Sequence, residues 1–475
     1  MVSICMPKRK ILLIGLDSMP DKEIFEKHKD ELPNLRKMLD NGFFATLESC
    51  HPPITVPAWR VMMSSKTPGR LGVYGFRHRK GYSYTDGWFT TSSAFHEPMI
   101  WDILKEKGKK SCLIGVPPTF PPIEINGNLV SCFVTPKDKT SGFTYPPELS
   151  EEINKIVNGK YIFDVLFRTE DRDAIIKNLY EMTEKRFQVI RHLMKTKEWD
   201  FLMFVEIGVD RLHHMFWKYY DKEHPRYEPD NKFQNVIPDY YKYIDKEIGK
   251  LLEMIDDDTY VITVSDHGTT SMKGAFCINE WLIKEGYLVL NNPPKDVTDI
   301  TKCDVNWGKT KAWGWGGYYA RIFFNIENRE DCGLLPPSKY DEFKKELESK
   351  LMQIGGPNGE KFDNKVIYPD EVYDQSNGSK PDMMVYFDNL YWRSAGTIGH
   401  NTLYLSENDT GPDDSVHWWD GMFMVYNKKN RVDGKRLEKM SIYDVAPIIL
   451  DIMSIDIPQD MRGKVPKQIS DWTDS

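Results

Sequence analysis

Short apolar runs, each followed by acidic or imidazole side chains, recur along this chain. Three of them occupy residues 11–16, 201–207 and 260–264. Runs of this length and composition are typical of parallel strands that are buried on both faces. Segments with apolar residues at helical spacing, such as 32–39 and 240–256, lie between them. This alternation predicts an α/β fold, in which helices flank a doubly wound, mostly parallel sheet.

The clean alternation of strands and helices is lost in the middle of the chain. Residues 291–380 hold several tryptophans, a glycine pair and isolated strand-like and helix-like stretches. We therefore predict an inserted or cap subdomain at 291–380, and a core formed by 1–290 and 381–475. The sheet of the core is expected to resume at 382–388, and residues 148–197 are expected to be helical.

Composition and charge narrow the class of protein. The 63 basic and 71 acidic residues give a net charge of -8, which argues against a dedicated nucleic-acid surface. No apolar stretch approaches the ~18 residues of a membrane span, and the run at 11–16 is too short for a signal peptide. The seven cysteines form no CxxC pair and are odd in number, as expected of free thiols in a reducing compartment. We therefore predict a soluble, cytoplasmic protein.

Polar side chains with metal-binding chemistry follow the three apolar runs. Asp17 ends the first, Asp210 and His214 follow the second, and Asp266 and His267 follow the third. Because parallel sheets place ligand sites beyond the carboxyl ends of their strands, these groups are expected to meet at one sheet edge. Three carboxylates and two imidazoles are costly to bury together without cations, so the cluster predicts metal ions.

The local spacing of these residues is compatible with shared metal ligation. Asp210 and His214 are four residues apart, which places both on one face of a helix. Asp266 and His267 are adjacent and precede Gly268, which permits the turn that lets both reach one centre. Each pair also has an ordinary explanation, since an aspartate can cap the next helix and can pair with a histidine at helical spacing.

Thr55 begins a predicted helix in the sequence Thr-Val-Pro. A hydroxyl at a helix N-terminus lies among unpaired amide groups, at the positive end of the helix dipole, where a phosphate binds favourably. A neighbouring divalent cation would lower the pKa of the hydroxyl and make Thr55 a nucleophile. The structural alternative is an ordinary N-cap threonine.

Five motifs in a fixed order link these residues. They are Leu16-Asp17, 32–35 (LPNL), 51–59 (HPPITVPAW), 210–217 (DRLHHMFW) and 264–268 (VSDHG). Their order and context resemble the alkaline phosphatase superfamily, and most closely its type I phosphodiesterase/nucleotide pyrophosphatase branch with the cytoplasmic phosphohydrolase and phosphomutase relatives. The resemblance covers about 11–290 and 381–463, and it implies an alkaline phosphatase-like core around the 291–380 insertion.

The resemblance also implies two divalent metal ions, most often zinc, with manganese as the alternative. The first ion would be bound by Asp17, Thr55, Asp266 and His267. The second would be bound by Asp210, His214 and a C-terminal histidine, for which we predict His417 because it precedes a glycine and a strand-like run, with His400 as the alternative. Thr55 would attack phosphorus and form a phosphothreonine intermediate, which water then hydrolyses.

The substrate expected from these features is a small phosphoester, most readily a phosphodiester or nucleotide pyrophosphate. Aromatic residues near the predicted site favour a stacked base or ring: Trp59, Tyr74, Trp88, Trp313 and Trp315. A phosphomonoesterase or phosphomutase would use the same metal core with added basic side chains. The candidates for that role are expected at the surface: Arg60, Lys66, Arg70, Arg77 and Arg79. A degenerate member that binds ligands without turnover is the non-enzymatic alternative.

Overall fold

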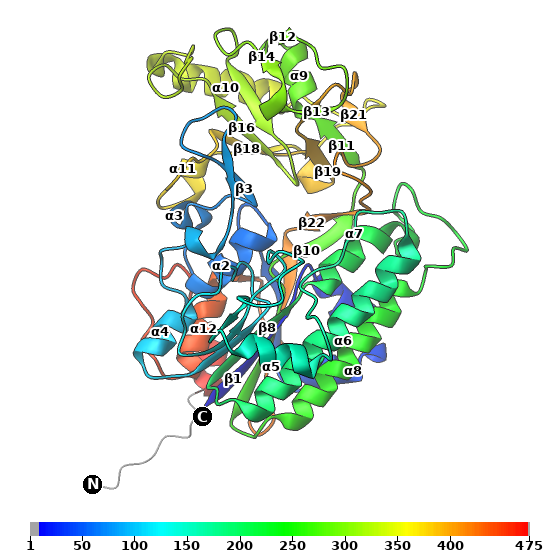
Figure 1. The fold of residues 1–475 in the computed structure, drawn as a ribbon, viewed down its shortest axis with the longest axis vertical. Helices are drawn as coiled ribbons and strands as arrows, with labels where there is room; N and C mark the ends of the chain where they lie inside the picture. The colour runs from blue at the N-terminus through cyan, green and yellow to red at the C-terminus, as the bar shows by residue number, and fades with distance from the viewer. Residues whose placement is uncertain (1–8, 474–475) are drawn as a thin grey trace.

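A ten-stranded sheet forms the centre of the larger part of the molecule, in a computed structural model that describes residues 9–473 (Figure 1). Nine of the strands lie in the order β24 (Lys435–Arg436), β2 (Phe43–Glu48), β23 (Asp420–Asn427), β9 (Thr259–Val264), β1 (Lys10–Leu16), β8 (Phe201–Glu206), β5 (Ser111–Ile114), β6 (Gly127–Val130) and β7 (Thr144–Tyr145). The tenth strand, β25 (Met440–Ser441), also pairs with β2. Strand β23 is antiparallel to both of its neighbours and β7 is antiparallel to β6, whereas the other pairs are parallel. The predicted mostly parallel sheet is confirmed.

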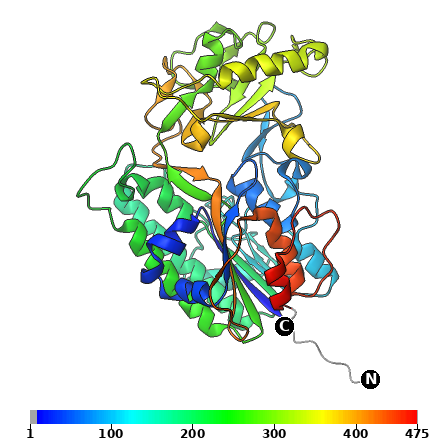
Figure 2. The same cartoon turned by 180° about the vertical axis from the view of Figure 1, so that it is seen from behind.

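Helices cover both faces of this sheet, because alternate side chains of each central strand point to opposite sides. Leu12 and Ile14 of β1 face one helical layer, whereas Ile11 and Leu13 face the other. The first layer contains α1 (Pro33–Asp40), α5 (Leu149–Ile156), α6 (Arg172–Thr196), α7 (Gly208–Tyr220) and α8 (Val236–Met254). The second contains α2 (Thr55–Ser64), α4 (Ile100–Glu106), α12 (Val445–Ile452) and α13 (Lys467–Thr473), which lie across the sheet from the first layer in both views (Figures 1 and 2).

A smaller part of the molecule packs around its own apolar core, above the carboxyl ends of the central strands (Figure 1). Its four-stranded sheet has the order β15 (Ala312–Trp315), β16 (Ala320–Phe324), β18 (Met383–Tyr386) and β17 (Lys365–Ile367). A three-stranded sheet has the order β19 (Trp392–Ala395), β11 (Gly274–Cys277) and β21 (Tyr404–Leu405). Phe276 and Trp392 therefore belong to this core, although both lie outside 291–380.

Short elements complete the structure and connect its two parts. The helices are α3 (Pro68–Leu71), α9 (Ile278–Lys284), α10 (Tyr340–Leu351) and α11 (Pro369–Val372). The two-stranded pairs are β3 (Arg77–Arg79) with β4 (Gly87–Phe89), β10 (Gly268–Ser271) with β22 (Ser415–Trp418), β12 (Leu290–Asn292) with β14 (Asp304–Val305), and β13 (Thr298–Asp299) with β20 (Thr397–Ile398). No helix within residues 9–473 is long and apolar enough to cross a membrane.

Two expectations about elements are corrected by the structure. The helical region 148–197 is interrupted between α5 and α6, because Asn158 and Gly159 adopt positive φ angles of 49° and 141° that end a helix. The strand expected at 382–388 forms as β18, but it pairs with β16 and β17. It therefore extends the smaller sheet, and the ten-stranded sheet resumes only at β23.

Candidate active site

The order of the central strands brings the three predicted aspartates together. Strands β9, β1 and β8 are parallel neighbours, with Gly15 in register with both Val264 and Val205. Their carboxyl ends therefore meet at one edge, where Asp266 follows β9 and Asp17 follows β1, and where Asp210 enters with the first turn of α7. All three aspartates are buried.

The first turns of α7 carry Asp210 and His214 on one face, as their spacing predicts. His214 Nε2 lies 3.2 Å from Asp210 Oδ1. The other oxygen of Asp210 accepts a hydrogen bond from Arg211 Nη1 at 2.7 Å. Although burial opposes ionisation, the His214 and Arg211 charges hold the pKa of Asp210 well below its ordinary value. Asp210 is therefore an anion with one oxygen directed toward the cluster.

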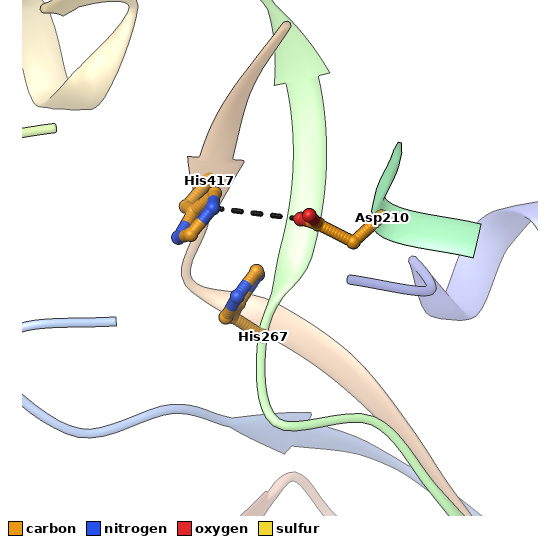
Figure 3. A group of neighbouring side chains, drawn as sticks. All are labelled: Asp210, His267 and His417. Atoms are coloured by element: carbon orange, nitrogen blue, oxygen red, sulfur yellow. Dashed lines mark ion pairs between the residues drawn. The ribbon is translucent and has the colours of Figure 1, made fainter. Parts of the chain in front are cut away.

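Two histidines reach the cluster from the β10–β22 ribbon (Figure 3). The rings of His267 and His417 are stacked with centroids 3.7 Å apart, and His417 Nε2 lies 3.6 Å from Asp210 Oδ1. Each ring donates its Nδ1 hydrogen to a backbone carbonyl, that of Gly268 at 2.9 Å and that of Pro53 at 2.8 Å. In both neutral rings, Nε2 therefore presents a lone pair to the cluster, as in a metal ligand.

Burial keeps these two imidazoles neutral. It lowers the pKa of His267 to about 4. Burial and the neighbouring His267 also hold the pKa of His417 well below its ordinary value. A protonated ring cannot bind a cation, so both shifts favour ligation over much of the neutral range. His214 differs: although burial opposes its charge, Asp413 and Asp210 hold its pKa well above the ordinary value, so a cation would displace a proton from this ring.

Thr55 is the first residue of α2, and it is buried beside the cluster. The N-cap position is occupied by Ile54, and no side chain caps this helix. Thr55 is therefore not the N-cap residue, which was the ordinary explanation for it. Its Oγ1 instead lies 3.4 Å from His267 Nε2.

Several ligand-type atoms in the cluster have no hydrogen-bond partner among residues 9–473. They are Asp17 Oδ1, Asp210 Oδ1, Asp266 Oδ2 and His417 Nε2. Leaving one such buried group without a partner costs about 1–3 kcal/mol, and more when the group is charged. Burial raises the pKa of both Asp17 and Asp266 well above the ordinary value, and the charge of Asp210 adds to this for Asp17. A divalent cation would satisfy these atoms and offset the repulsion, so the donor set fits a metal centre.

The donor atoms form two overlapping groups, in each of which all atoms lie within 4.8 Å of one another. One group is Asp17, Asp266 and His267, and the other is Asp210, His267 and His417. His267 is common to both, so the residues form one continuous cluster. His214 and His400 belong to neither group. His214 Nε2 lies 3.2 Å from Asp210 Oδ1, whereas His400 Nε2 contacts Thr397 Oγ1 at 2.7 Å in the smaller part of the molecule.

The structure adds residues to the site that no sequence pattern indicated. His214 Nδ1 donates to Asp413 Oδ1 at 2.7 Å, and Arg393 and Arg168 donate to the other oxygen of Asp413. The hydroxyl of Tyr318 lies 3.0 Å from His214 Nε2. Arg168, Tyr318, Arg393 and Asp413 come from three segments far apart in the chain, so no local spacing could have indicated them.

Trp59 donates a hydrogen bond to a candidate metal ligand. Its Nε1 donates to Asp17 Oδ2 at 2.7 Å, and its ring is fully buried. Gly15 permits this approach, because a Cβ at that position would lie only 2.6 Å from the Trp59 ring. Trp59 therefore orients a candidate ligand rather than stacking on a substrate.

A cavity of about 690 Å³ opens beside the cluster and lies between the two parts of the molecule. Its lining residues include neither Thr55 nor the candidate ligands, but they include Ile54, Arg211 and Tyr318, each of which is adjacent to, or hydrogen-bonded to, a residue of the cluster. Of the aromatic residues expected near the site, Trp88 and Trp315 line the cavity, whereas Trp59, Tyr74 and Trp313 are buried in the core.

Only one of the five basic residues that follow Thr55 lines this cavity, namely Arg77. The surface position expected for Arg60, Lys66 and Arg79 is wrong, because all three are buried. Arg60 donates to a backbone carbonyl, and the other two form ion pairs with Asp460 and Glu330.

This fold and its buried carboxylate–imidazole edge define an alkaline phosphatase-like protein. The chain belongs to the type I phosphodiesterase/nucleotide pyrophosphatase family, whose model matches residues 11–413. The resemblance drawn from the five motifs is therefore confirmed. No curated protein matches the sequence.

Solved structures of ectonucleotide pyrophosphatase/phosphodiesterase 5 share the fold. The human protein is 13% identical with a TM-score of 0.57, and the similarity covers 98% of this chain and 99% of that one. An inactive murine variant in complex with AMP is 12% identical with a TM-score of 0.55, and the coverage is the same. At this identity, the similarity concerns the fold.

Proposed function

We propose that this protein is a two-metal phosphodiesterase or nucleotide pyrophosphatase that acts through a covalent phosphothreonine. One observation carries the proposal: four buried ligand atoms without hydrogen-bond partners among the described residues converge beside the Thr55 hydroxyl. The family match supports the reaction class, because this family is one of phosphodiesterases and nucleotide pyrophosphatases.

The residues that would hold the two ions are those that the sequence predicts. Asp17, Asp266 and His267, together with Thr55, would hold the first ion. Asp210, His214 and His417 would hold the second ion, and the ring of His267 lies close to both groups. Mixed nitrogen and oxygen donors suit zinc, and the oxygen-rich first set would also accept manganese. When bound, such ions act as Lewis acids and lower the pKa of hydroxyl and water oxygens.

In the first step, Thr55 Oγ1 attacks phosphorus and releases its proton to solvent. A new O–P bond forms as the bond to the leaving oxygen breaks, and the leaving oxygen takes up a proton from solvent. A water oxygen then displaces Thr55 in the same way and regenerates the hydroxyl. Two in-line displacements give net retention of configuration at phosphorus.

The remaining residues hold the reacting groups in place. Thr55 lies at the N-terminus of α2, where unpaired amide groups and the helix dipole stabilise a phosphoryl group. Trp59 fixes the orientation of Asp17, and Asp413 fixes that of His214. The carbonyls of Pro53 and Gly268 fix the tautomers of His417 and His267.

A nucleotide-like substrate is supported by the cavity beside the cluster. Its wall includes Trp88, Phe89 and Trp315, which offer aromatic surfaces for a ring. The murine relative crystallised with AMP is consistent with this choice.

Cytoplasmic residence is part of the same proposal. The cysteines within residues 9–473 are unpaired, and four of them are buried: Cys50, Cys112, Cys132 and Cys277. Cys5 lies outside the described residues. Free thiols are typical of a reducing compartment.

Hydrolysis of bis-p-nitrophenyl phosphate by metal-reconstituted protein tests the proposed reaction. Thr55→Ala should lower kcat by about 10³-fold or more, since loss of a covalent nucleophile commonly costs this much. Thr119→Ala is the matched control, because it removes another buried threonine hydroxyl outside the cluster, and it should keep most of the activity.

Two results would refute the proposal. Unchanged activity of Thr55→Ala would exclude Thr55 as the nucleophile, and full activity after exhaustive chelation would exclude the metal centre. A clear preference for p-nitrophenyl phosphate over the bis ester would reassign the protein as a phosphomonoesterase.

A further inference from the structure

Arg321 is a buried cation without a carboxylate partner among the described residues. It lies on β16 with 8% of its surface exposed, and it lines the cavity beside the cluster. Its Nη1 donates to the carbonyl of Arg77, and its guanidinium lies 5.4 Å from the centroid of the Trp315 ring. Within residues 9–473, no carboxylate oxygen lies within 4.0 Å of it. Burial lowers the pKa of Arg321, which reflects the cost of holding this charge in place.

The other buried or half-buried arginines of the cavity are neutralised by the protein. Arg211 forms a two-point ion pair with Asp164 and also donates to Asp210. Arg168 and Arg393 both pair with Asp413. These three arginines therefore hold carboxylates in and around the cluster, whereas the positive charge of Arg321 faces the cavity without a carboxylate partner among the described residues.

The surroundings of Arg321 favour an anionic group with an adjacent ring. Arg77 is close by, since its carbonyl accepts from Arg321, and Trp315 presents an aromatic face. The cavity also has two carboxylates, Asp299 and Asp409. Asp299 lies 4.0 Å from Arg77, and Asp409 accepts hydrogen bonds from Thr397, so both already have partners.

Arg321 lies within substrate reach of the reacting centre. Tyr318, which contacts His214, and Arg321 line the same cavity and are three residues apart. Their Cα atoms are therefore at most about 11 Å apart. Because the cavity is lined by both residues, the proposal places one substrate along it, from the cluster to Arg321.

The geometry points to Arg321 as a specificity-determining residue that binds a second anionic group on the substrate. The inference rests on the proposed function, because the scissile phosphoryl group is placed at Thr55. The preferred substrate is then a phosphodiester or pyrophosphate whose retained organic substituent carries a further phosphate. Arg321 donates two hydrogen bonds to that phosphate, from Nη2 and Nε, while Nη1 remains on the carbonyl of Arg77.

Two esters that differ by one phosphate test this inference. They are thymidine 5′-(p-nitrophenyl phosphate) and the same ester with a 3′-phosphate, compared by kcat/KM. Charge-assisted hydrogen bonds of about 1.5–3 kcal/mol correspond to roughly 10- to 100-fold. The 3′-phosphate should therefore raise kcat/KM by about this factor, and Arg321→Gln should remove the advantage while changing the unphosphorylated ester by less than about threefold.

A binding measurement separates failure of this inference from failure of the proposed function. The Thr55→Ala protein is titrated calorimetrically with thymidine 5′-monophosphate and with thymidine 3′,5′-bisphosphate, without any turnover. Tighter binding of the bisphosphate by about tenfold or more, lost in Thr55→Ala/Arg321→Gln, supports the second anion site even if neither ester is hydrolysed. Equal affinity for the two nucleotides overturns it.

Arg60→Gln is the matched control for loss of a buried arginine. Arg60 also donates to a backbone carbonyl and packs on aromatic rings, but it does not line the cavity. It should lower stability without changing the ratio of kcat/KM for the two esters. If Arg321→Gln lowers kcat/KM for both esters equally, its role is structural and the inference is wrong.

Discussion

The hydrogen bond from Trp59 to Asp17 should set the affinity of the first metal site. Trp59→Phe removes the Nε1 donor that lies 2.7 Å from Asp17 Oδ2. Because Asp17 Oδ1 has no hydrogen-bond partner among the described residues, the variant leaves both oxygens of the carboxylate without a protein donor. A hydrogen bond to an ionised group contributes about 1.5–3 kcal/mol. That value corresponds to roughly a 10- to 100-fold change in a binding constant.

Trp101→Phe provides a matched control for the change in packing. Trp101 is as buried as Trp59 and belongs to the same apolar layer, but its Nε1 has no partner within residues 9–473. The Arg60 guanidinium that lies over the Trp101 ring keeps an aromatic face in the variant. The two substitutions therefore remove the same atoms, and only one removes a hydrogen bond to a candidate ligand.

The assay is competition for zinc against a chromophoric chelator at pH 7.5. Trp59→Phe should weaken zinc binding by about 10- to 100-fold, as is typical for loss of a group that orients a metal ligand. Trp101→Phe should leave the affinity within a fewfold of the unmodified protein. If both variants bind zinc equally well, Asp17 is not oriented by Trp59 in the metal-bound protein.

Two further predictions follow from the same cluster. Asp413→Asn should also weaken metal binding by about 10- to 100-fold, because His214 loses its charged acceptor, whereas Asp414→Asn, which removes a neighbouring carboxylate with no hydrogen bond within residues 9–473, should have a much smaller effect. In the metal-free protein, burial raises the pKa of Asp17 and Asp266 above the value of about 3.9 expected after unfolding. Their contribution to stability is complete below about pH 4 and is lost as the pH rises through the raised pKa values. Zinc should therefore raise Tm more at pH 7.5 than at pH 5, and the reverse order in a thermal scan would contradict the assignment.

Much of the cluster could be predicted from the sequence. A short apolar run ending in aspartate is a local signal, and parallel strands bring their carboxyl ends to one edge whatever their spatial order. The helical spacing of Asp210 and His214 similarly fixed their common face. These features depend on chain geometry over only a few residues.

The roles of single residues were harder to predict from the sequence. Two interpretations of Thr55 were open from the sequence, a nucleophile and an N-cap residue. The backbone conformation shows that Ile54 occupies the N-cap position of α2. Phe276 and Trp392 also join the apolar core of the smaller part, although both lie outside 291–380.

The fold class, the aspartates at the strand ends and the family could all be predicted from the sequence, because periodicity, composition and motif order are properties of the linear chain. Which partners orient those ligands, and which charge remains unpaired, depends instead on the folded structure. Asp413 contacts His214 across 199 positions, and Arg321 has no carboxylate partner within residues 9–473 because of the segments that pack around it. Such contacts depend on the packing of segments distant in the chain, and a local pattern carries no record of them.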